Sequence, residues 1–578
     1  MPGEGGAAEL QRESEGSSVR LDSWKEIAAY LRRDPRTVRR WERQEGLPVR
    51  RHLHGKRGSI YAFTHEIDKW LQTRSVVGTA QLPENDALHG AAGPGLRTEQ
   101  IARRSRPVVL AVLPLRNRSN DPEQERFADG LTEEIISEAG QCCPNRLRVI
   151  SLTSVLQYKH SGTGVREIGR ELSADYILEG GIRRYGRRVR LTARLFATRD
   201  EANVWADTYE VQLPSLFALQ QSLVGQLLES LAAELRVGPV RSRHRPMLLN
   251  TSAHNAYIEG RTFFLPTDRD IKKKLESLYI AIERDPKFAP SYAELALAYF
   301  ICIFRDNPPV VTFARMRELA SRCLELDSSL ARAHTVMAAF YLFGARNWPR
   351  AQASSKRAVK LNPSDPWARI IRAAYHIVVE EPENAMKELE QARQLGPKSA
   401  ELTQWSVVFG FYARHYDWAI ECGQEMLQLD PFPGSIHAVL GACFAQKGNN
   451  ALAVQHCEAA TALGKGPFVG HARAASTYVL AGNRTAAERL LQELVVAEER
   501  EYVRYMFLAQ ASVALGNDER TLDWLEKAYE QSDPLLVFLK ADPSFDPLLG
   551  LPRFRRLLRR IGLPVDQERR PPSGVPRS

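Results

Sequence analysis

A 34-residue spacing of small side chains runs through the second half of this 578-residue chain. Three series keep that spacing: Ala351, Ala385, Ala419, Ala453 and Ala487; Ala358, Ala392, Met426, Ala460, Leu494 and Ala528; Ala339, Ala373, Val407, Gly441, Ala475 and Ala509. Pro363, Pro397 and Pro431 follow the same step. Small residues at a fixed period let helices cross closely, so the sequence predicts a stack of similar helix pairs rather than one globular core.

This pattern resembles the tetratricopeptide repeat, in which two helices form each unit. We count about eight helix pairs between residues 250 and 535, with the looser units at the start. The resemblance implies a right-handed superhelix whose concave face binds a peptide or helix of an unknown partner protein. Residues 536–578 are expected to form a last helix and a basic tail.

The start of the chain carries the signals of a helix-turn-helix. Ser23 followed by Glu26 is a capping box, which predicts a helix beginning at Trp24. A tight turn follows, and Asp34 with Pro35 predicts the start of a second helix. Two short helices across such a turn are typical of a helix-turn-helix.

Basic side chains gather on the second helix and on a glycine-bounded hairpin that follows it. The candidate DNA-binding residues are Arg36, Thr37, Arg39, Arg40, Arg43, Arg50, Arg51, Lys56 and Arg57. Arginine suits this role because its planar fork of donors matches guanine O6/N7 and phosphate oxygens. Lys56 and Arg57 lie at the hairpin tip, between Gly55 and Gly58, where we expect contacts to phosphate rather than to bases.

Three segments of this region, 21–28, 36–42 and 46–49, resemble the excisionase-like and MerR-like winged helices of bacterial regulators. The resemblance implies that residues 21–74 bind double-stranded DNA. The net charge of this segment supports DNA binding, because it holds 13 Lys/Arg against 7 Asp/Glu, a net +6. The alternative is a tetratricopeptide scaffold whose amino-terminal module docks protein and does not bind DNA.

Residues 107–238 read as an α+β domain. Apolar residues 108–115 predict a buried strand, residues 176–184 and 187–196 predict a hairpin, and residues 216–235 predict a closing helix. The sequence segments 111–115, 127–131 and 178–184 resemble the FlgO-like or TolB-amino-terminal-like domain. Residues 1–20 are expected to be a disordered tail, and residues 75–106 a flexible linker.

Signals of catalysis and of membrane insertion are weak. The sequence has no G-x-x-x-x-G-K-[ST], H-E-x-x-H or G-x-S-x-G, and its seven cysteines form no C-x-x-C pair. We therefore expect no enzyme, no cofactor and no metal site. No apolar run is long enough for a membrane span, which favours a cytoplasmic location without membrane contact.

The sequence as a whole predicts a multi-domain fold: a small winged helix-turn-helix, an α+β domain and an all-α tetratricopeptide solenoid. The predicted function is that of a DNA-binding transcriptional regulator with a repeat region for protein interaction or sensing. The sequence leaves open whether two copies of this chain form a homodimer.

Overall fold

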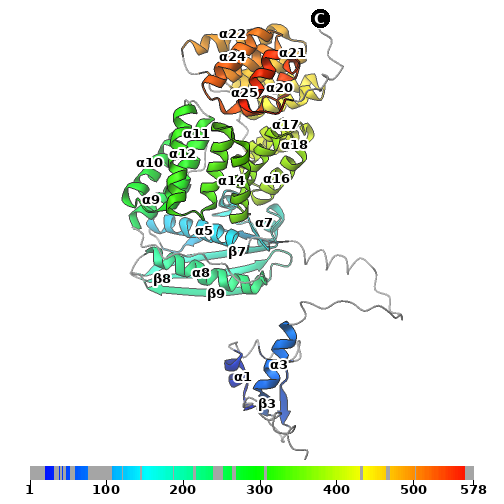
Figure 1. Cartoon of the computed structure of the whole chain (residues 1–578). Helices are drawn as coiled ribbons and strands as arrows, with labels where there is room; N and C mark the ends of the chain where they lie inside the picture. The colour runs from blue at the N-terminus through cyan, green and yellow to red at the C-terminus, as the bar shows by residue number, and fades with distance from the viewer. Residues whose placement is uncertain are drawn as a thin grey trace, which may run out of the picture. The chain divides into compact units, whose positions relative to one another are not determined.

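The structure is a computed structural model, and it divides the chain into two compact units, Met1–Glu99 and Gln100–Ser578 (Figure 1). It describes residues 20–31, 38, 42, 47–52, 59–75, 107–119, 122–143, 146–185, 188–212, 216–237, 251–262, 268–304, 309–429, 434–463, 469–500 and 503–565. The expected tail at 1–20, apart from Arg20, and the expected linker at 75–106, apart from Ser75, lie outside these residues.

The amino-terminal unit is built on a three-stranded antiparallel sheet in the order β1-β3-β2. The strands are β1 (Arg20–Leu21), β2 (Arg50–His52) and β3 (Ser59–Phe63), and the helices are α1 (Trp24–Tyr30) and α3 (Thr64–Ser75). One bond of the capping box is formed as predicted, because the Glu26 backbone N–H donates to Ser23 Oγ at 3.2 Å. The Asp22 N–H in turn donates to Glu26 Oε2 at 2.8 Å. These bonds fix the start of α1 at the predicted residue.

The core of this unit joins both helices and the sheet. It consists of the buried residues Ile27, Ala28, Val38, Leu47, Ala62 and Ile67. Val38 and Glu42 are helical, and they are the described residues of the predicted second helix. The rest of that helix, and the hairpin tip at residues 53–58, lie outside the described residues.

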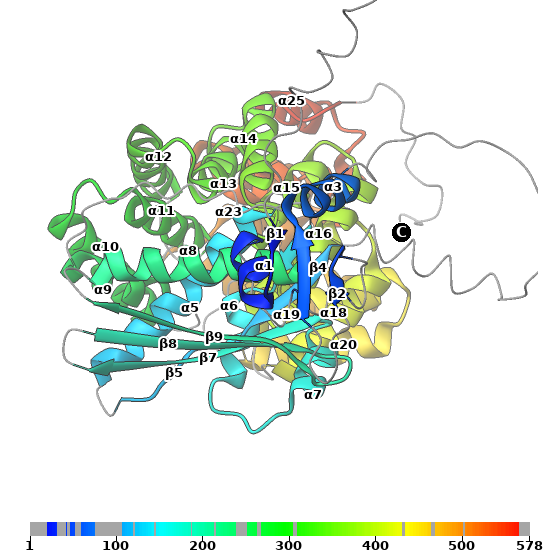
Figure 2. The ribbon, with the colours of Figure 1, turned by 90° about the horizontal axis from the view of Figure 1, so that it is seen from below.

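The second unit begins with a mixed sheet in the order β6-β4-β7-β8-β9, with β5 pairing on β7 (Figure 2). The strands are β4 (Val108–Val112), β5 (Arg116–Asn117), β6 (Leu147–Val149), β7 (Tyr176–Tyr185), β8 (Arg188–Ala197) and β9 (Asn203–Gln212). β4 runs parallel to β6 and β7, whereas β7, β8 and β9 are antiparallel. The predicted hairpin is therefore confirmed as β7 and β8.

Helices cover both faces of this sheet. The long helices α5 (Pro122–Cys142) and α8 (Leu216–Leu235) share one apolar cluster with the sheet. The short helices α6 (Leu152–Val155) and α7 (Val165–Glu171) share another, together with η1 (Leu156–Tyr158). The expected α+β architecture is present, and its first long helix, α5, begins at Pro122.

Eight helix pairs follow in the part of the chain that the structure describes. They are α9/α10 (Thr251–Thr262, Asp268–Arg284), α11/α12 (Ala289–Ile303, Pro309–Leu326), α13/α14 (Ala331–Ala339, Trp348–Leu361), α15/α16 (Pro366–Val378, Pro382–Leu395), α17/α18 (Ala400–Tyr412, Tyr416–Leu429), α19/α20 (Gly434–Gln446, Asn450–Leu463), α21/α22 (Val469–Leu480, Arg484–Glu498) and α23/α24 (Tyr505–Ala514, Asp518–Glu530). In the third pair a π-helical turn, η2 (Phe340–Gly344), extends α13. The phased small residues are buried within these pairs, as their spacing predicts.

The chain ends in two 3-10 turns, η3 (Pro534–Phe538) and η4 (Pro543–Leu548), and a last helix, α25 (Pro552–Ile561). α25 is amphipathic, with Phe554, Leu557 and Leu558 buried against the repeats. Among the described helices, none combines the length and the apolar character that a membrane crossing requires.

Candidate functional site

The amino-terminal unit carries the candidate nucleic-acid interface. Seven of its nine predicted residues lie outside the described part of the chain: Arg36, Thr37, Arg39, Arg40, Arg43, Lys56 and Arg57. Arg50 and Arg51 lie in β2. The exposed Arg50 forms an ion pair with Glu66 of α3, and its guanidinium lies 5.6 Å from the centre of the Phe63 ring.

The structure adds one basic residue that the sequence interpretation missed. Arg20 of β1 places its guanidinium 4.4 Å from the centre of the Tyr61 ring, and its Nε lies 2.7 Å from Asp22. In the sheet register Arg20 lies opposite Phe63, and Arg50 opposite Tyr61. Paired residues of neighbouring strands share a face, so Arg20, Arg50 and the two aromatic rings form one cationic and aromatic surface.

A second candidate site is a cavity of about 120 Å³ where the sheet domain meets the repeats. The sheet domain lines it with α5 and α6, and the repeats line it with α9, α10, α11 and the first turns of α13, α15 and α17. The ionisable side chains around it are Glu133, Arg261, Lys274, Glu294, Arg332, Asp365 and Glu401. These ionisable side chains are largely buried, and buried charged groups require ion-pair partners or a ligand.

Two arginines carry most of the ion pairing in this cavity. Arg261 pairs with Glu133, and its Nε lies 3.7 Å from Oε1 of Glu294. Arg332 reaches the same Glu294 oxygen at 3.2 Å and Asp365 at 3.0 Å. Asp365 also caps α15 by accepting the backbone N–H of Trp367 at 3.1 Å.

Burial shifts the pKa values of Glu133, Glu401 and Lys274 toward the neutral forms of these side chains. It raises the pKa of Glu133 and raises the pKa of Glu401 to about 7. It also lowers the pKa of Lys274. Burial alone would raise the pKa of Glu294, but Arg332, Arg261 and Lys274 outweigh it and lower that pKa.

One polar atom of this cavity has no partner. The Glu133 side chain is 9% exposed, and its Oε2 accepts no hydrogen bond within the described structure. A buried carboxylate oxygen without a donor costs free energy, so it marks a place where a ligand or ordered water would bind.

Close contacts fix the sheet domain against the repeats around the cavity. A Cβ on Gly140 of α5 would lie 2.9 Å from Cβ of Ser364, so only glycine allows this approach. The Ser151 N–H donates to the Leu395 carbonyl at 2.7 Å, and the Lys398 N–H donates to Ser154 Oγ at 3.2 Å. Figure 1 shows α5 between the sheet and the first repeat helices. The cavity walls are therefore held in place by direct hydrogen bonds and packing.

No local pattern in the sequence marks this cavity. Its residues come from separate helices between α5 and α17, and each reads in isolation as an ordinary surface charge. Only the packing of the sheet domain on the repeats brings them together.

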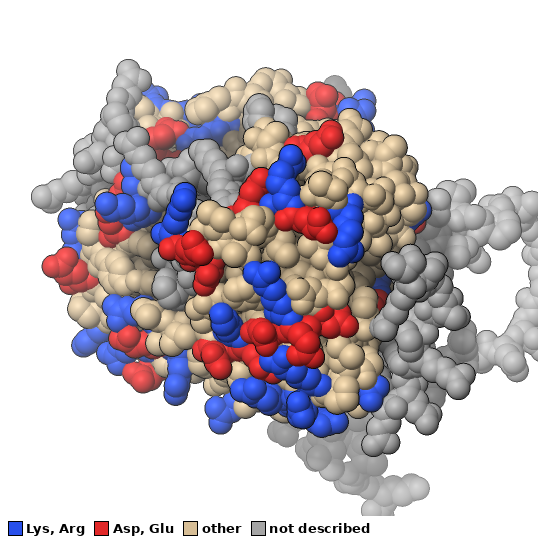
Figure 3. All heavy atoms as spheres, turned by 90° about the horizontal axis from the view of Figure 1, so that it is seen from above, with Lys and Arg blue, Asp and Glu red and all other residues tan. Residues whose placement is uncertain are grey.

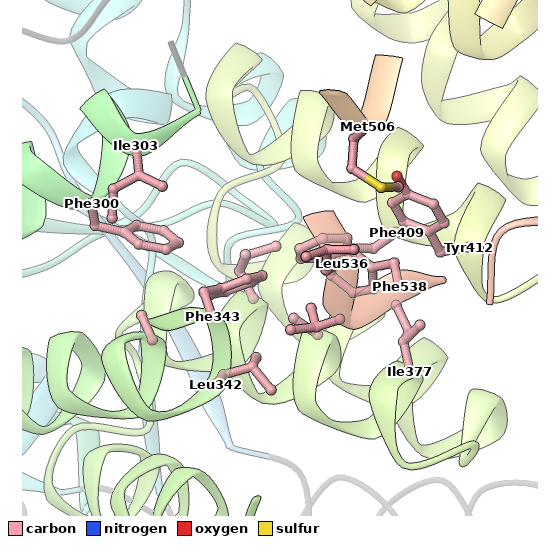
Figure 4. Packing of buried hydrophobic residues seen from close by; sticks show 14 of the residues in the cluster. Phe300, Ile303, Leu342, Phe343, Ile377, Phe409, Tyr412, Met506, Leu536 and Phe538 are labelled. Atoms are coloured by element: carbon pink, nitrogen blue, oxygen red, sulfur yellow. The ribbon is translucent and has the colours of Figure 1, made fainter. Parts of the chain in front are cut away.

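The inner surface of the repeats is partly filled by the chain itself (Figure 4). Phe538 of η3 packs against Phe343, Phe409 and Tyr412, with ring centroids 5.9, 5.6 and 4.5 Å apart. Lys540 forms an ion pair with Glu380, and Arg414 one with Asp546 at 2.6 Å. This part of the inner surface is not open to an external peptide, so the predicted peptide partner would need another part of it.

The first arginine of α25 is paired with acidic residues of the neighbouring helix. Arg553 pairs with Glu519, Asp523 and Glu526 of α24 at 3.0, 2.7 and 2.8 Å. Lys and Arg are interspersed with Asp and Glu over the face in Figure 3. The described part of α25 is therefore partly neutralised by its neighbour.

Comparisons with known proteins identify part of this architecture. Residues 106–227 match the model of the HilA/YgeH-like transcriptional regulator, second domain. This model differs from the FlgO-like and TolB-like domains that the sequence resembles, so those resemblances stay predictions. The chain thus combines a regulator-like sheet domain with a tetratricopeptide-like helical repeat.

A curated relative from Rhizobium meliloti (strain 1021), named putative adenylate cyclase 3, is 30% identical over 233 residues. The match covers 40% of this chain and 39% of the relative, so the chain spans about two fifths of the relative's length. The prediction that the chain is not an enzyme is contradicted by this match, because a protein that shares these residues is named for an enzymatic activity.

Solved structures give more distant likenesses. Yeast Tom70 is 12% identical, with 61% of this chain and 78% of that chain covered and a TM-score of 0.33. A tetratricopeptide repeat protein from Parabacteroides merdae is 14% identical. The match covers 51% of this chain and 99% of that chain, with a TM-score of 0.29. The helix pairs of this chain, rather than these likenesses, define its repeat.

Proposed function

We propose that this protein is a transcriptional regulator that binds double-stranded DNA through its amino-terminal unit. The single observation that carries the proposal is the match of residues 106–227 to a domain of transcriptional regulators. The winged helix-turn-helix prediction supplies the DNA-binding part, and the cytoplasm is the location that this role implies.

The amino-terminal unit supports this role through its core and its sheet surface. Ile27, Val38 and Ile67 are fully buried, so α1, the segment around Val38 and α3 share one core. Arg20 and Arg50 are exposed beside Tyr61 and Phe63. Guanidinium groups on such a surface can neutralise phosphates, and each neutralised phosphate adds to the salt dependence of binding.

In this proposal the residues of the predicted second helix read the bases. Arg36, Thr37, Arg39, Arg40 and Arg43 would enter the major groove, because helical spacing would leave them on the other sides of that helix when Val38 faces the core. Lys56 and Arg57 would contact phosphates, as would Arg51. Arg50 would join them only by exchanging its ion pair with Glu66 for a phosphate.

The test is a salt titration with the full chain. Fluorescence anisotropy with a random-sequence duplex should give a dissociation constant that rises steeply with salt, on a straight log–log line, because binding releases counterions. A protein-docking module has no reason to behave in this way. Absence of binding at low salt would overturn the proposal and leave the tetratricopeptide scaffold as the function.

A further inference from the structure

The cavity between the sheet domain and the repeats has the size of a small-ligand site. It measures about 120 Å³ and is lined by side chains from both regions. Roughly 10–15 Å³ of such space holds one water molecule, so the cavity has room for a ligand of several non-hydrogen atoms. Typical drug-sized sites are larger, at about 300 Å³ or more, which points to a small molecule.

The charges around the cavity are not balanced. Four carboxyl groups (Glu133, Glu294, Asp365 and Glu401) face three cationic groups (Arg261, Lys274 and Arg332). Both arginines are engaged, since Arg261 pairs with Glu133 and Arg332 bridges Glu294 and Asp365. The carboxyl groups therefore exceed the cations by one.

Two of these carboxyl groups have spare acceptor capacity. Glu133 Oε2 is buried and accepts no hydrogen bond in the described structure. No described residue donates a hydrogen bond to the Glu401 carboxylate, which lies in the first turn of α17. Glu133 comes from α5 of the sheet domain and Glu401 from α17 of the repeats, so a ligand that reaches both would complete the hydrogen bonding of both.

These features select the chemistry of the ligand. An anion would add to the excess of negative charge, and an apolar molecule would leave Glu133 Oε2 without a donor. Among the described residues there is no cluster of three or more His, Cys, Asp or Glu arranged for a metal ion. A primary ammonium group offers three N–H donors and one positive charge. Lys274 already supplies one such group to the cavity, and a second would give Glu133 Oε2 a donor and balance the fourth carboxyl group.

We propose that this cavity binds a small molecule that carries a protonated primary amine, held between the carboxylates of Glu133 and Glu401. Burial raises the pKa of both carboxyl groups, and an ammonium placed between them would favour their ionised forms. The inference goes beyond the proposed function and does not depend on DNA binding. A bound amine would touch both the sheet domain and the repeats.

Isothermal titration calorimetry with the full chain tests this site, with 1,4-diaminobutane and butylamine as probes. Butyrate and sodium chloride at matched ionic strength control for anion and salt effects. We expect saturable binding of one amine per chain, and none of butyrate. Absence of saturable binding by both amines, or binding of butyrate instead, would overturn the proposal.

Variants locate the binding. Glu133→Gln and Glu401→Gln each remove one charge at constant shape and should weaken amine binding at least about tenfold, the loss expected for one charged hydrogen bond. Glu458→Gln, on the exposed side of α20, is the matched control and should bind as the unaltered chain does. Glu133→Gln disturbs the Arg261 pair, so thermal unfolding must show that it folds. Glu401→Gln breaks no hydrogen bond that the structure shows, and unchanged binding in this variant would contradict the site.

Discussion

The ring of Phe538 stacks on the ring of Tyr412, with centroids 4.5 Å apart and an angle of 13° between the planes. Phe538 belongs to η3, after the last helix pair, whereas Tyr412 ends the inner helix α17. The segment that follows the repeats therefore returns to their inner surface (Figure 4). A repeat array normally has contacts between neighbouring units only, and this contact links distant units.

Truncation of this contact should destabilise the repeat region. Phe538→Ala removes a ring that is 1% exposed, and a buried Phe→Ala change costs about 3–5 kcal/mol. Urea unfolding followed by circular dichroism measures the free energy of unfolding. Leu480→Ala is the control, because Leu480 is 52% exposed and its loss should cost little. Equal effects in both variants would show that the returning segment does not stabilise the repeats.

Enlarging a phased small residue should also destabilise one helix crossing. A Cβ on Gly441 would lie 3.0 Å from Cys457 Sγ and 3.1 Å from the Ala453 carbonyl oxygen, so even one added carbon is crowded and a larger side chain would push the helices apart. Gly441→Leu or Ala453→Leu should cost at least about 1–3 kcal/mol through overpacking. Ala451→Leu, at an exposed position of the same helix α20, is the matched control. Hydrogen exchange should show the loss of protection in α19, α20 and their neighbours.

DNA binding should survive Ala453→Leu, because the amino-terminal unit is a separate compact unit. The salt titration described for the unaltered chain applies here. A parallel loss of DNA binding in a still soluble Ala453→Leu sample would contradict the modular account.

The wing should act through phosphate contacts. Lys56→Ala combined with Arg57→Ala should weaken binding about equally for all DNA sequences and reduce the slope of log K against log salt by roughly one to two units. Competition between duplexes of different sequence measures this. Loss confined to one base position would mean that these residues read bases instead.

Acidification should destabilise the fold partly through His456 of α20. Burial, followed by the nearby His437, lowers the pKa of His456 to about 4, below its ordinary value of 6.5. A group with a lowered pKa in the folded state binds more protons when unfolded, so its contribution is present above about pH 6.5 and is lost as pH falls toward 4.

His456→Gln removes this titration. The raised pKa of Glu401 acts in the opposite direction between its ordinary value of 4.5 and about 7. The informative quantity is therefore the difference in free energy of unfolding between the variant and the unaltered chain. The free energy of unfolding of the unaltered chain minus that of the His456→Gln variant should decrease as the pH falls from 7 to 4. A difference that is constant with pH would show that His456 does not titrate as its burial indicates.

Local signals in the sequence predicted much of the fold. The Ser23 and Glu26 pair located the start of α1, because capping depends only on neighbouring residues. The 34-residue step located the helix pairs, since each unit repeats the same crossing. Strands β7 and β8 followed from their length and alternation.

Features that depend on distant contacts escaped prediction. β1 has two residues, too few for any periodicity, yet it positions Arg20 over Tyr61. The charged cavity exists because Glu133 and Glu401 meet through domain packing. The stacking of Phe538 likewise depends on the path of the whole superhelix.

Selection of bound DNA from a sheared genomic library tests the central claim most directly. The full chain should enrich fragments that share a common sequence, whereas Arg39→Ala combined with Arg40→Ala should lose that enrichment, because the predicted second helix reads the bases. Folding of the variant is checked by circular dichroism. Enrichment of no common sequence by the unaltered chain, or the same enrichment by the variant, would contradict the account of a regulator that reads DNA through this helix.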